Sequence, residues 1–142
     1  NDPFVHDLRG QILLESRNFK AAVGAYGKAV SIAPKNALIL AGYGRSLLAL
    51  KTRDGDAKAL RVLVQARARD GRNPVLLRDL ATAYARAGNN GMASATTAER
   101  YAIVGDLKNA AIHAKRAAGL LPQGSVGWNR AQDVLNAART AG

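Results

Sequence analysis

The spacing of two glycines, Gly10 and Gly44, constrains the fold of this chain more than any other feature of its sequence. Each glycine is followed three positions later by leucine, and both fall inside segments of helical composition. Further along the chain, small residues recur at a similar spacing, from Ala22 to Ala59 and from Ala59 to Ala93. A period of about 34 residues is typical of stacked helix pairs, in which small residues allow the helices to approach closely.

Capping residues and helix breakers divide the chain into eight segments of helical length. The expected helices cover residues 3–16, 19–32, 37–51, 57–69, 74–87, 91–104, 107–120 and 126–139. Turns of two to five residues join them and make neighbouring helices antiparallel. Capping oxygens are expected from Asp2, Asn18, Asn36, Asp56, Asn73, Asp106 and Ser125, and helix ends at Pro34, Gly55, Gly71, Gly88, Gly105 and Pro122.

Composition agrees with an all-α fold. The 142 residues include 29 alanines and no cysteine, and alanine is the strongest helix former. A chain of this length buries roughly two thirds of its unfolded surface and needs no disulfide or metal for stability. We expect a single domain over residues 1–142, a right-handed superhelix of about four antiparallel helix pairs with the last helix as a cap. Two coincidental four-helix bundles are the structural alternative.

The sequence contains no apolar run of the roughly 20 residues that a transmembrane helix needs. Residues 1–10 do not resemble a signal peptide, and the chain starts at Asn1 without a methionine. We therefore expect a soluble fragment of a longer protein, with any signal sequence upstream.

The net charge of +11 comes from 21 basic and 10 acidic residues and raises nucleic acid or an anionic surface as a partner. The basic residues are spread along the chain, and only Arg67, Arg69 and Arg72 lie close together. This distribution favours a solvated basic face. A basic module that binds nucleic acid or an anionic surface is kept as the alternative.

The repeated positions resemble the tetratricopeptide repeat (TPR), which carries W-x2-L-G-x2-Y on its first helix and A-x3-F-x2-A, then proline, on its second. His6 and Leu40 stand where tryptophan is usual, and Gly71 replaces one terminal proline. Gly88 and Gly105 are half a period apart, so the helix at 91–104 is expected to close one pair and open the next. The matching residues are Gly10, Ala22, Tyr26, Ala29, Pro34, Gly44, Leu47, Ala59, Leu63, Ala66, Leu77, Leu80, Ala81, Tyr84, Gly88, Tyr101, Gly105, Ala110, Ala114, Ala117 and Pro122.

Four runs, at residues 1–11, 105–108, 114–117 and 120–135, are similar to the C-terminal region of BepA-like zinc metallopeptidases of peptidase family M forty-eight. These proteins join a catalytic domain to a TPR domain. The resemblance implies a periplasmic parent protein that acts in outer-membrane quality control, binds zinc, and uses its TPR domain to recruit the assembly machinery or substrate.

The sequence itself contains no catalytic pattern. The H-E-x-x-H motif of the resembled family is absent, and the two histidines, His6 and His113, fall in the first and the seventh expected helix without a neighbouring glutamate. We assign both histidines to surface or packing roles. This chain is therefore expected to be non-catalytic, with no cofactor and no metal ligands, and the catalytic domain of the parent would lie upstream.

Function is expected on the first helix of each pair, which lines the concave face of a helical-repeat superhelix. Arg45, Arg78 and Arg86 are expected to converge there and to suit an acidic peptide or a C-terminal carboxylate. The alternative is that they only solvate a helix face. Lys115 and Arg116 are expected on the convex face. The predicted groove consists of Gln11, Arg45, Leu48, Arg78, Thr82 and Arg86, with Phe4, Asp7, Leu14 and Ala41 also facing outward.

The function predicted from the sequence is a protein–protein interaction module that binds a protein or peptide, acidic in character. Its partners would be the catalytic domain of the parent or the outer-membrane assembly machinery. The lysine and asparagine clamp of chaperone-binding TPR proteins is not reproduced, because Gln11 and Arg45 occupy the relevant turn. A stand-alone TPR scaffold or co-chaperone is the further alternative.

Overall fold

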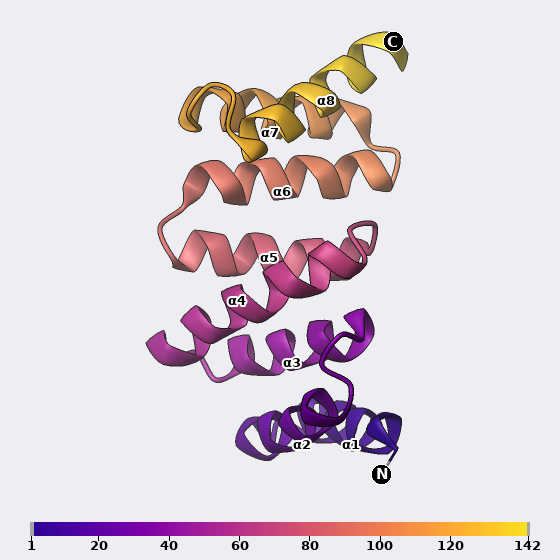
Figure 1. The fold of residues 1–142 in the computed structure, drawn as a ribbon. Helices are drawn as coiled ribbons and strands as arrows, with labels where there is room; N and C mark the ends of the chain where they lie inside the picture. The colour runs from indigo at the N-terminus through magenta and orange to yellow at the C-terminus, as the bar shows by residue number, and fades with distance from the viewer. Residues whose placement is uncertain (1, 142) are drawn as a thin grey trace. The chain divides into compact units, whose positions relative to one another are not determined.

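The computed structural model describes residues 2–141, and within this range the chain forms eight α-helices and no strand (Figure 1). The helices gather into two compact units, Asn1–Gly71 with the first four and Arg72–Gly142 with the last four. The all-α prediction with eight helices is confirmed, and the single domain over residues 1–142 stays a prediction. The helices are α1 (Pro3–Glu15), α2 (Phe19–Ile32), α3 (Ala37–Ala49), α4 (Arg53–Arg69), α5 (Pro74–Arg86), α6 (Asn90–Ile103), α7 (Leu107–Leu120) and α8 (Val126–Ala141).

The start of α4 lies one turn earlier than the sequence prediction. Thr52 caps this helix, and its hydroxyl oxygen accepts a hydrogen bond of 3.0 Å from the backbone N–H of Gly55. Gly55 is buried in the first turn, where a Cβ would lie 2.7 Å from the Thr52 hydroxyl oxygen and 3.0 Å from the carbonyl oxygen of Leu47. The predictions of a helix end at Gly55 and a cap at Asp56 are therefore wrong. Glycine is needed here because the first turn of α4 lies directly against the end of α3.

Most of the other predicted caps are confirmed. Side-chain oxygens of five residues accept hydrogen bonds of 2.8–3.3 Å from backbone N–H groups in the first turn of the helix that follows: Asp2, Asn36, Asn73, Asp106 and Ser125. Asn18 precedes α2 without a side-chain capping bond, so that prediction is wrong.

The repeat is visible in the backbone as well as in the sequence. After α1, α3, α5 and α6, one residue in each turn adopts a left-handed conformation: Arg17 (φ 64°), Lys51 (φ 55°), Gly88 (φ 78°) and Gly105 (φ 85°). Arg17 and Lys51 are separated by one period, Lys51 and Gly88 by a slightly longer period, and Gly88 and Gly105 by half a period. The small residues show the same spacings in the sequence. The half-period at the last of these turns is therefore a feature of the fold.

In the first unit, two glycines allow three helices to pack around one aromatic ring. The ring of Tyr26 on α2 lies against Gly10 of α1, where a Cβ would be 2.7 Å from two ring carbons, and against Gly42 of α3. Similarly, a Cβ at Gly44 would lie 2.5 Å from the side chain of Leu63 on α4. Tyr26 and Leu63 are buried. Glycine is therefore the residue that this spacing requires.

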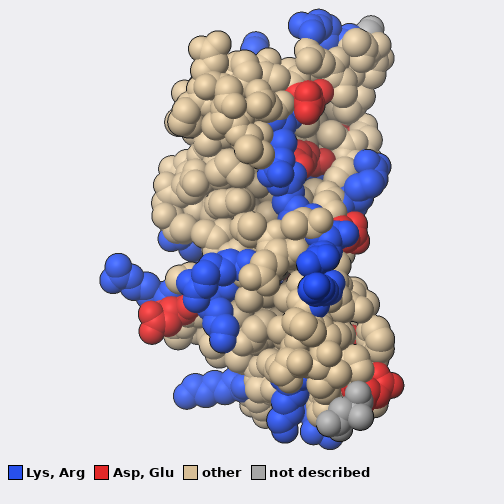
Figure 2. Space-filling view, viewed as in Figure 1, with Lys and Arg blue, Asp and Glu red and all other residues tan. Residues whose placement is uncertain are grey.

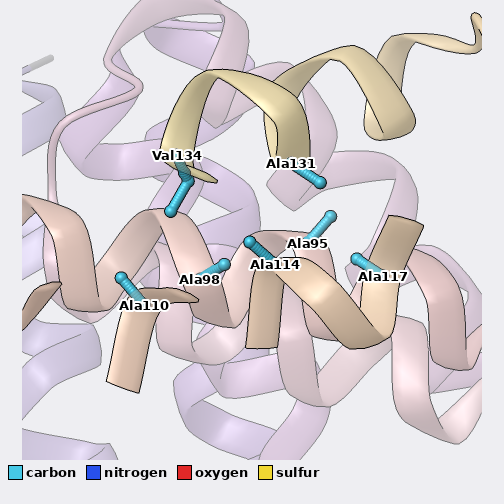
Figure 3. Packing of buried hydrophobic residues seen from close by; sticks show 7 residues of the cluster. All are labelled: Ala95, Ala98, Ala110, Ala114, Ala117, Ala131 and Val134. Atoms are coloured by element: carbon cyan, nitrogen blue, oxygen red, sulfur yellow. The ribbon is translucent and has the colours of Figure 1, made fainter. Parts of the chain in front are cut away.

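In the second unit, glycine allows close approach at Gly91 and Gly127, and buried alanines form the core. α6 packs against α5, α7 and α8, and the core between α6, α7 and α8 consists of Ala95, Ala98, Ala110, Ala114, Ala117, Ala131 and Val134 (Figure 3). The contact of α6 with α8 matches the contact of α1 with α3 in the first unit. The prediction that the helix at 91–104 pairs with both the helix before it and the helix after it is therefore confirmed. The last helix, α8, covers the apolar end of the second unit.

Substitution of glycine by alanine separates these packing contacts from helix propensity. Gly10→Ala places a methyl group into the Tyr26 ring, so we expect a loss of about 1–3 kcal/mol in the free energy of unfolding. Gly24→Ala, in α2, meets no atom within 4 Å, and we expect a gain of up to about 1 kcal/mol from helix propensity. Urea unfolding followed by circular dichroism measures both values. Equal shifts in the two variants would show that the close approach to Tyr26 does not matter.

A cationic pocket on helices α5 to α7

Residues of α5, α6 and α7, in the second unit, line an open pocket of about 340 Å³. It contains three arginines, a histidine and three hydroxyl side chains, and no acidic residue lines it within the described chain. The lining residues are Arg78, Ala81, Thr82 and Ala85 of α5, Ala93, Ser94, Thr97 and Arg100 of α6, and His113 and Arg116 of α7.

Helix periodicity brings the polar lining residues to the pocket. Ser94, Thr97 and Arg100 follow one another at every third position of α6, and His113 and Arg116 have the same spacing on α7. Residues three apart lie on one face of a helix. The alanine core occupies other positions of the same two helices, so close packing in the core brings the polar rows of α6 and α7 together at the surface.

A stack of three side chains fixes one wall of the pocket. The guanidinium carbon of Arg100 lies 4.8 Å from the ring centroid of Tyr101, in cation–π geometry. The Tyr101 ring stacks on the imidazole of His113, with the two centroids 5.4 Å apart and an angle of 16° between the ring planes. Tyr101 therefore links two of the pocket's basic side chains.

His113 is held in its neutral form. Burial lowers the pKa of His113 below its ordinary value of 6.5, and the charges of Arg116 and Arg100 lower it further. Each of these causes disfavours the imidazolium ion. The pocket at pH 7 therefore contains three guanidinium groups around a neutral imidazole.

The positive charge of Arg78 is only weakly neutralised by the neighbouring carboxylate of Asp79. The Nε atom of Arg78 lies 3.8 Å from a carboxylate oxygen of Asp79, but half of the Arg78 side chain is exposed, and such surface pairs contribute little. The hydroxyl of Thr82 donates a 3.1 Å hydrogen bond to the carbonyl oxygen of Arg78. An anion that enters the pocket would meet several charged hydrogen-bond donors.

Two of the residues assigned to the predicted groove lie in this pocket, and the groove itself stays a prediction. Arg78 and Thr82 line it as predicted groove residues, whereas the predicted residue Arg86 is exposed on α5 and does not line it. The placement of Arg116 on a face away from the groove residues is wrong, because it lines the same pocket as Arg78. The remaining polar lining residues were not predicted, although their recurrence at every third position of consecutive helices is a signal that the sequence contains: Ser94, Thr97, Arg100 and His113.

The other predicted groove residues lie in the first unit. Gln11 of α1 donates a 3.1 Å hydrogen bond to the Asp7 carboxylate, which is buried at 6% exposure rather than facing outward. Burial raises the pKa of Asp7, and the Gln11 hydrogen bond partly opposes this. Leu48 is also only 6% exposed, so its predicted outward orientation is wrong: this position on α3 faces the core.

The charge of Arg45, on α3, acts on the Tyr26 hydroxyl, as does the charge of Asp7. The pKa of Tyr26 is raised to about 12 by burial and by the charges of Asp7 and Glu15, and the charge of Arg45 opposes this rise. The convergence of Arg45 with Arg78 and Arg86, which belong to the other unit, stays a prediction.

Basic side chains are scattered rather than gathered on the face that Figure 2 shows. Within residues 2–141, no three side chains of histidine, aspartate or glutamate lie together in an arrangement that could hold a metal ion. None of the described helices combines the length and apolar character of a membrane span.

The fold is similar to that of known TPR proteins. A thermophilic TPR protein of Thermus thermophilus, TTC0263, has a TM-score of 0.56 and 18% sequence identity, over 96% of this chain and 82% of that protein. The MamA protein has a TM-score of 0.56 and 13% identity, over 97% of this chain and 86% of that one. No family model and no curated protein matches the sequence. At these identities the similarity establishes a TPR-like fold and does not identify a partner.

The lowered pKa of His113 gives a prediction about pH. NMR titration of the imidazole, assigned with a His113→Gln variant, should give a midpoint below 6.5, and Arg116→Gln should raise it. Because the unfolded chain binds this proton more readily, the contribution of His113 to stability is complete above pH 6.5 and falls as the pH drops towards the pKa of the folded state. A midpoint at or above 6.5 would contradict this description of the pocket.

Proposed function

We propose that this chain is a non-catalytic protein-interaction module of the TPR type, which binds an acidic segment of a partner protein. The observation that carries this proposal is the pocket on α5 to α7, where Arg78, Arg100 and Arg116 line a concave surface that no acidic residue lines within residues 2–141. Guanidinium groups bind carboxylates with two parallel hydrogen bonds, and stacked helix pairs are well suited to hold peptide segments.

The first unit carries a second candidate contact surface. Gln11 lies on α1 and is hydrogen-bonded to Asp7, and Arg45 lies on α3. The charges of Asp7 and Arg45 both act on the Tyr26 hydroxyl. In this proposal Gln11 and Arg45 contact a further segment of the partner. Arg86, exposed at the end of α5, adds a positive charge to the surface of the second unit.

We also propose that the parent protein is a periplasmic zinc metallopeptidase that acts in outer-membrane quality control. The resemblance of residues 1–11 and 105–135 to BepA-like proteins supports this. The described residues of this chain do not fit a zinc site, so in this proposal the metal and the catalytic residues belong to another part of the parent. The partner is then the parent's own catalytic domain, its substrate or the assembly machinery.

Retention of a partner by the immobilised chain tests the interaction proposal. Replacement of Arg78, Arg100 and Arg116 by alanine removes charged hydrogen bonds worth roughly 1.5–3 kcal/mol each in binding, so the partner retained from the cell envelope of the source organism should be lost. Lys115→Ala with Arg139→Ala, which removes exposed charges of the same unit, should retain it. Equal retention by both variants would contradict the proposal. Binding to duplex DNA that weakens steeply with salt would instead support the nucleic-acid alternative.

The reading frame upstream of Asn1 tests the proposed parent protein. It should encode an H-E-x-x-H helix behind a signal peptide, and elemental analysis should find zinc in the parent but not in this chain. An upstream frame without this motif would refute the metallopeptidase proposal. Stoichiometric zinc or peptidase turnover in this chain alone would refute its non-catalytic role.

A further inference from the structure

The basic side chains of the pocket on α5 to α7 form two groups at opposite ends. Arg78 lies in the first half of α5 and Arg100 near the end of α6. Because a short turn makes these two helices antiparallel, both arginines lie at the same end of the pocket. Arg116 lies in the second half of α7, which runs beside the first half of α6, where Ser94 lies. Arg116 therefore marks the other end.

The separation of the two ends follows from helix geometry. Six positions separate Ser94 from Arg100 on α6, which corresponds to about 9 Å along the helix axis. Between them lie Thr97 and His113, and His113 is close enough to both Arg116 and Arg100 for its pKa to respond to both charges. The pocket is thus an elongated trough with positive charge at each end and a neutral polar middle.

An extended peptide matches this arrangement. Side chains at positions i and i+2 of an extended chain lie on the same face, about 6.6 Å apart, and the length of the arginine side chains covers the remaining distance. Two guanidinium groups at one end can hold one carboxylate and Arg116 the other.

We propose that this pocket recognises two acidic side chains, aspartate or glutamate, that are separated by one neutral residue in an extended segment of a partner protein. Arg78 and Arg100 bind one carboxylate and Arg116 binds the other. In this proposal the hydroxyl groups of Thr97 and Ser94, which line the pocket, face the peptide backbone and the neutral residue between the two carboxylates. This inference rests on the proposed protein-binding function and adds the spacing of the charges that the partner must present.

Titration calorimetry on the full chain tests the spacing directly. The probe is a capped seven-residue peptide with glutamate at its third and fifth positions and alanine, serine and glycine elsewhere. Control peptides have the same composition with the two glutamates adjacent, or glutamine in place of both. The spaced peptide should bind at least about tenfold more tightly than either control, which corresponds to the loss of one charged contact.

Variants locate the binding site. Arg100→Gln with Arg116→Gln should weaken binding of the spaced peptide at least about tenfold. Lys115→Gln with Arg139→Gln, which removes the same charge from the same unit outside the pocket, should change it less than about twofold. Urea unfolding of each variant verifies that it is folded. Because Arg116 is exposed, Arg116→Glu provides a second test: it should bind a peptide with lysine in place of one glutamate more tightly than the spaced glutamate peptide.

Several outcomes would overturn the inference. Equal binding of the spaced and adjacent peptides would show that only net charge is recognised, as would equal weakening by the two double variants. Tighter binding of a single-stranded oligonucleotide with the same variant dependence would identify a polyanion site. Any of these outcomes rejects only the proposed carboxylate spacing if the wild-type chain still retains the envelope partner and the Arg78, Arg100 and Arg116 alanine variant loses it. Loss of the spacing preference together with no retained partner rejects the proposed function as well.

Discussion

Close approach of helices through residues without large side chains is the constraint on which the rest of this structure depends. In the first unit, Gly10 and Gly42 leave room for the Tyr26 ring between α1, α2 and α3. In the second unit, buried alanines such as Ala98 and Ala114 let α6, α7 and α8 pack closely. Dispersion and burial stabilise such contacts only when the surfaces fit. A larger side chain at these positions would separate the helices.

The charged pocket is a consequence of this packing. Arg78, Arg100 and Arg116 come from three different helices, and like charges at close range repel one another. The repulsion is tolerated because the helices are held together by their alanine core rather than by the polar surface. Burial lowers the pKa of His113, and the charges of Arg116 and Arg100 lower it further. The anionic partner proposed above would relieve this repulsion.

The half-period in the repeat explains why the pocket lies on α5 to α7. Because α6 is the second helix of the pair with α5 and also the first helix of the pair with α7, it belongs to two successive pairs. Its surface row of Ser94, Thr97 and Arg100 is therefore bordered by a helix on each side. In the first unit, where the full period holds, α1 contacts α3 directly.

The sequence by itself determined the helical class, most helix ends, the repeat and its half-period, because glycine, proline and capping oxygens act through the local backbone and small residues recur at fixed spacing. The tertiary structure decided which face of each helix is exposed. Leu48 was predicted to face outward but is buried, and Arg116 lines the pocket that it was predicted to avoid. Neighbouring positions on a helix differ by about 100° in direction, so an exposed face becomes known only when the helices packed on either side are known. The same reason explains α4, which starts at Arg53 because Gly55 fits against α3, a contact that no local sequence signal contains.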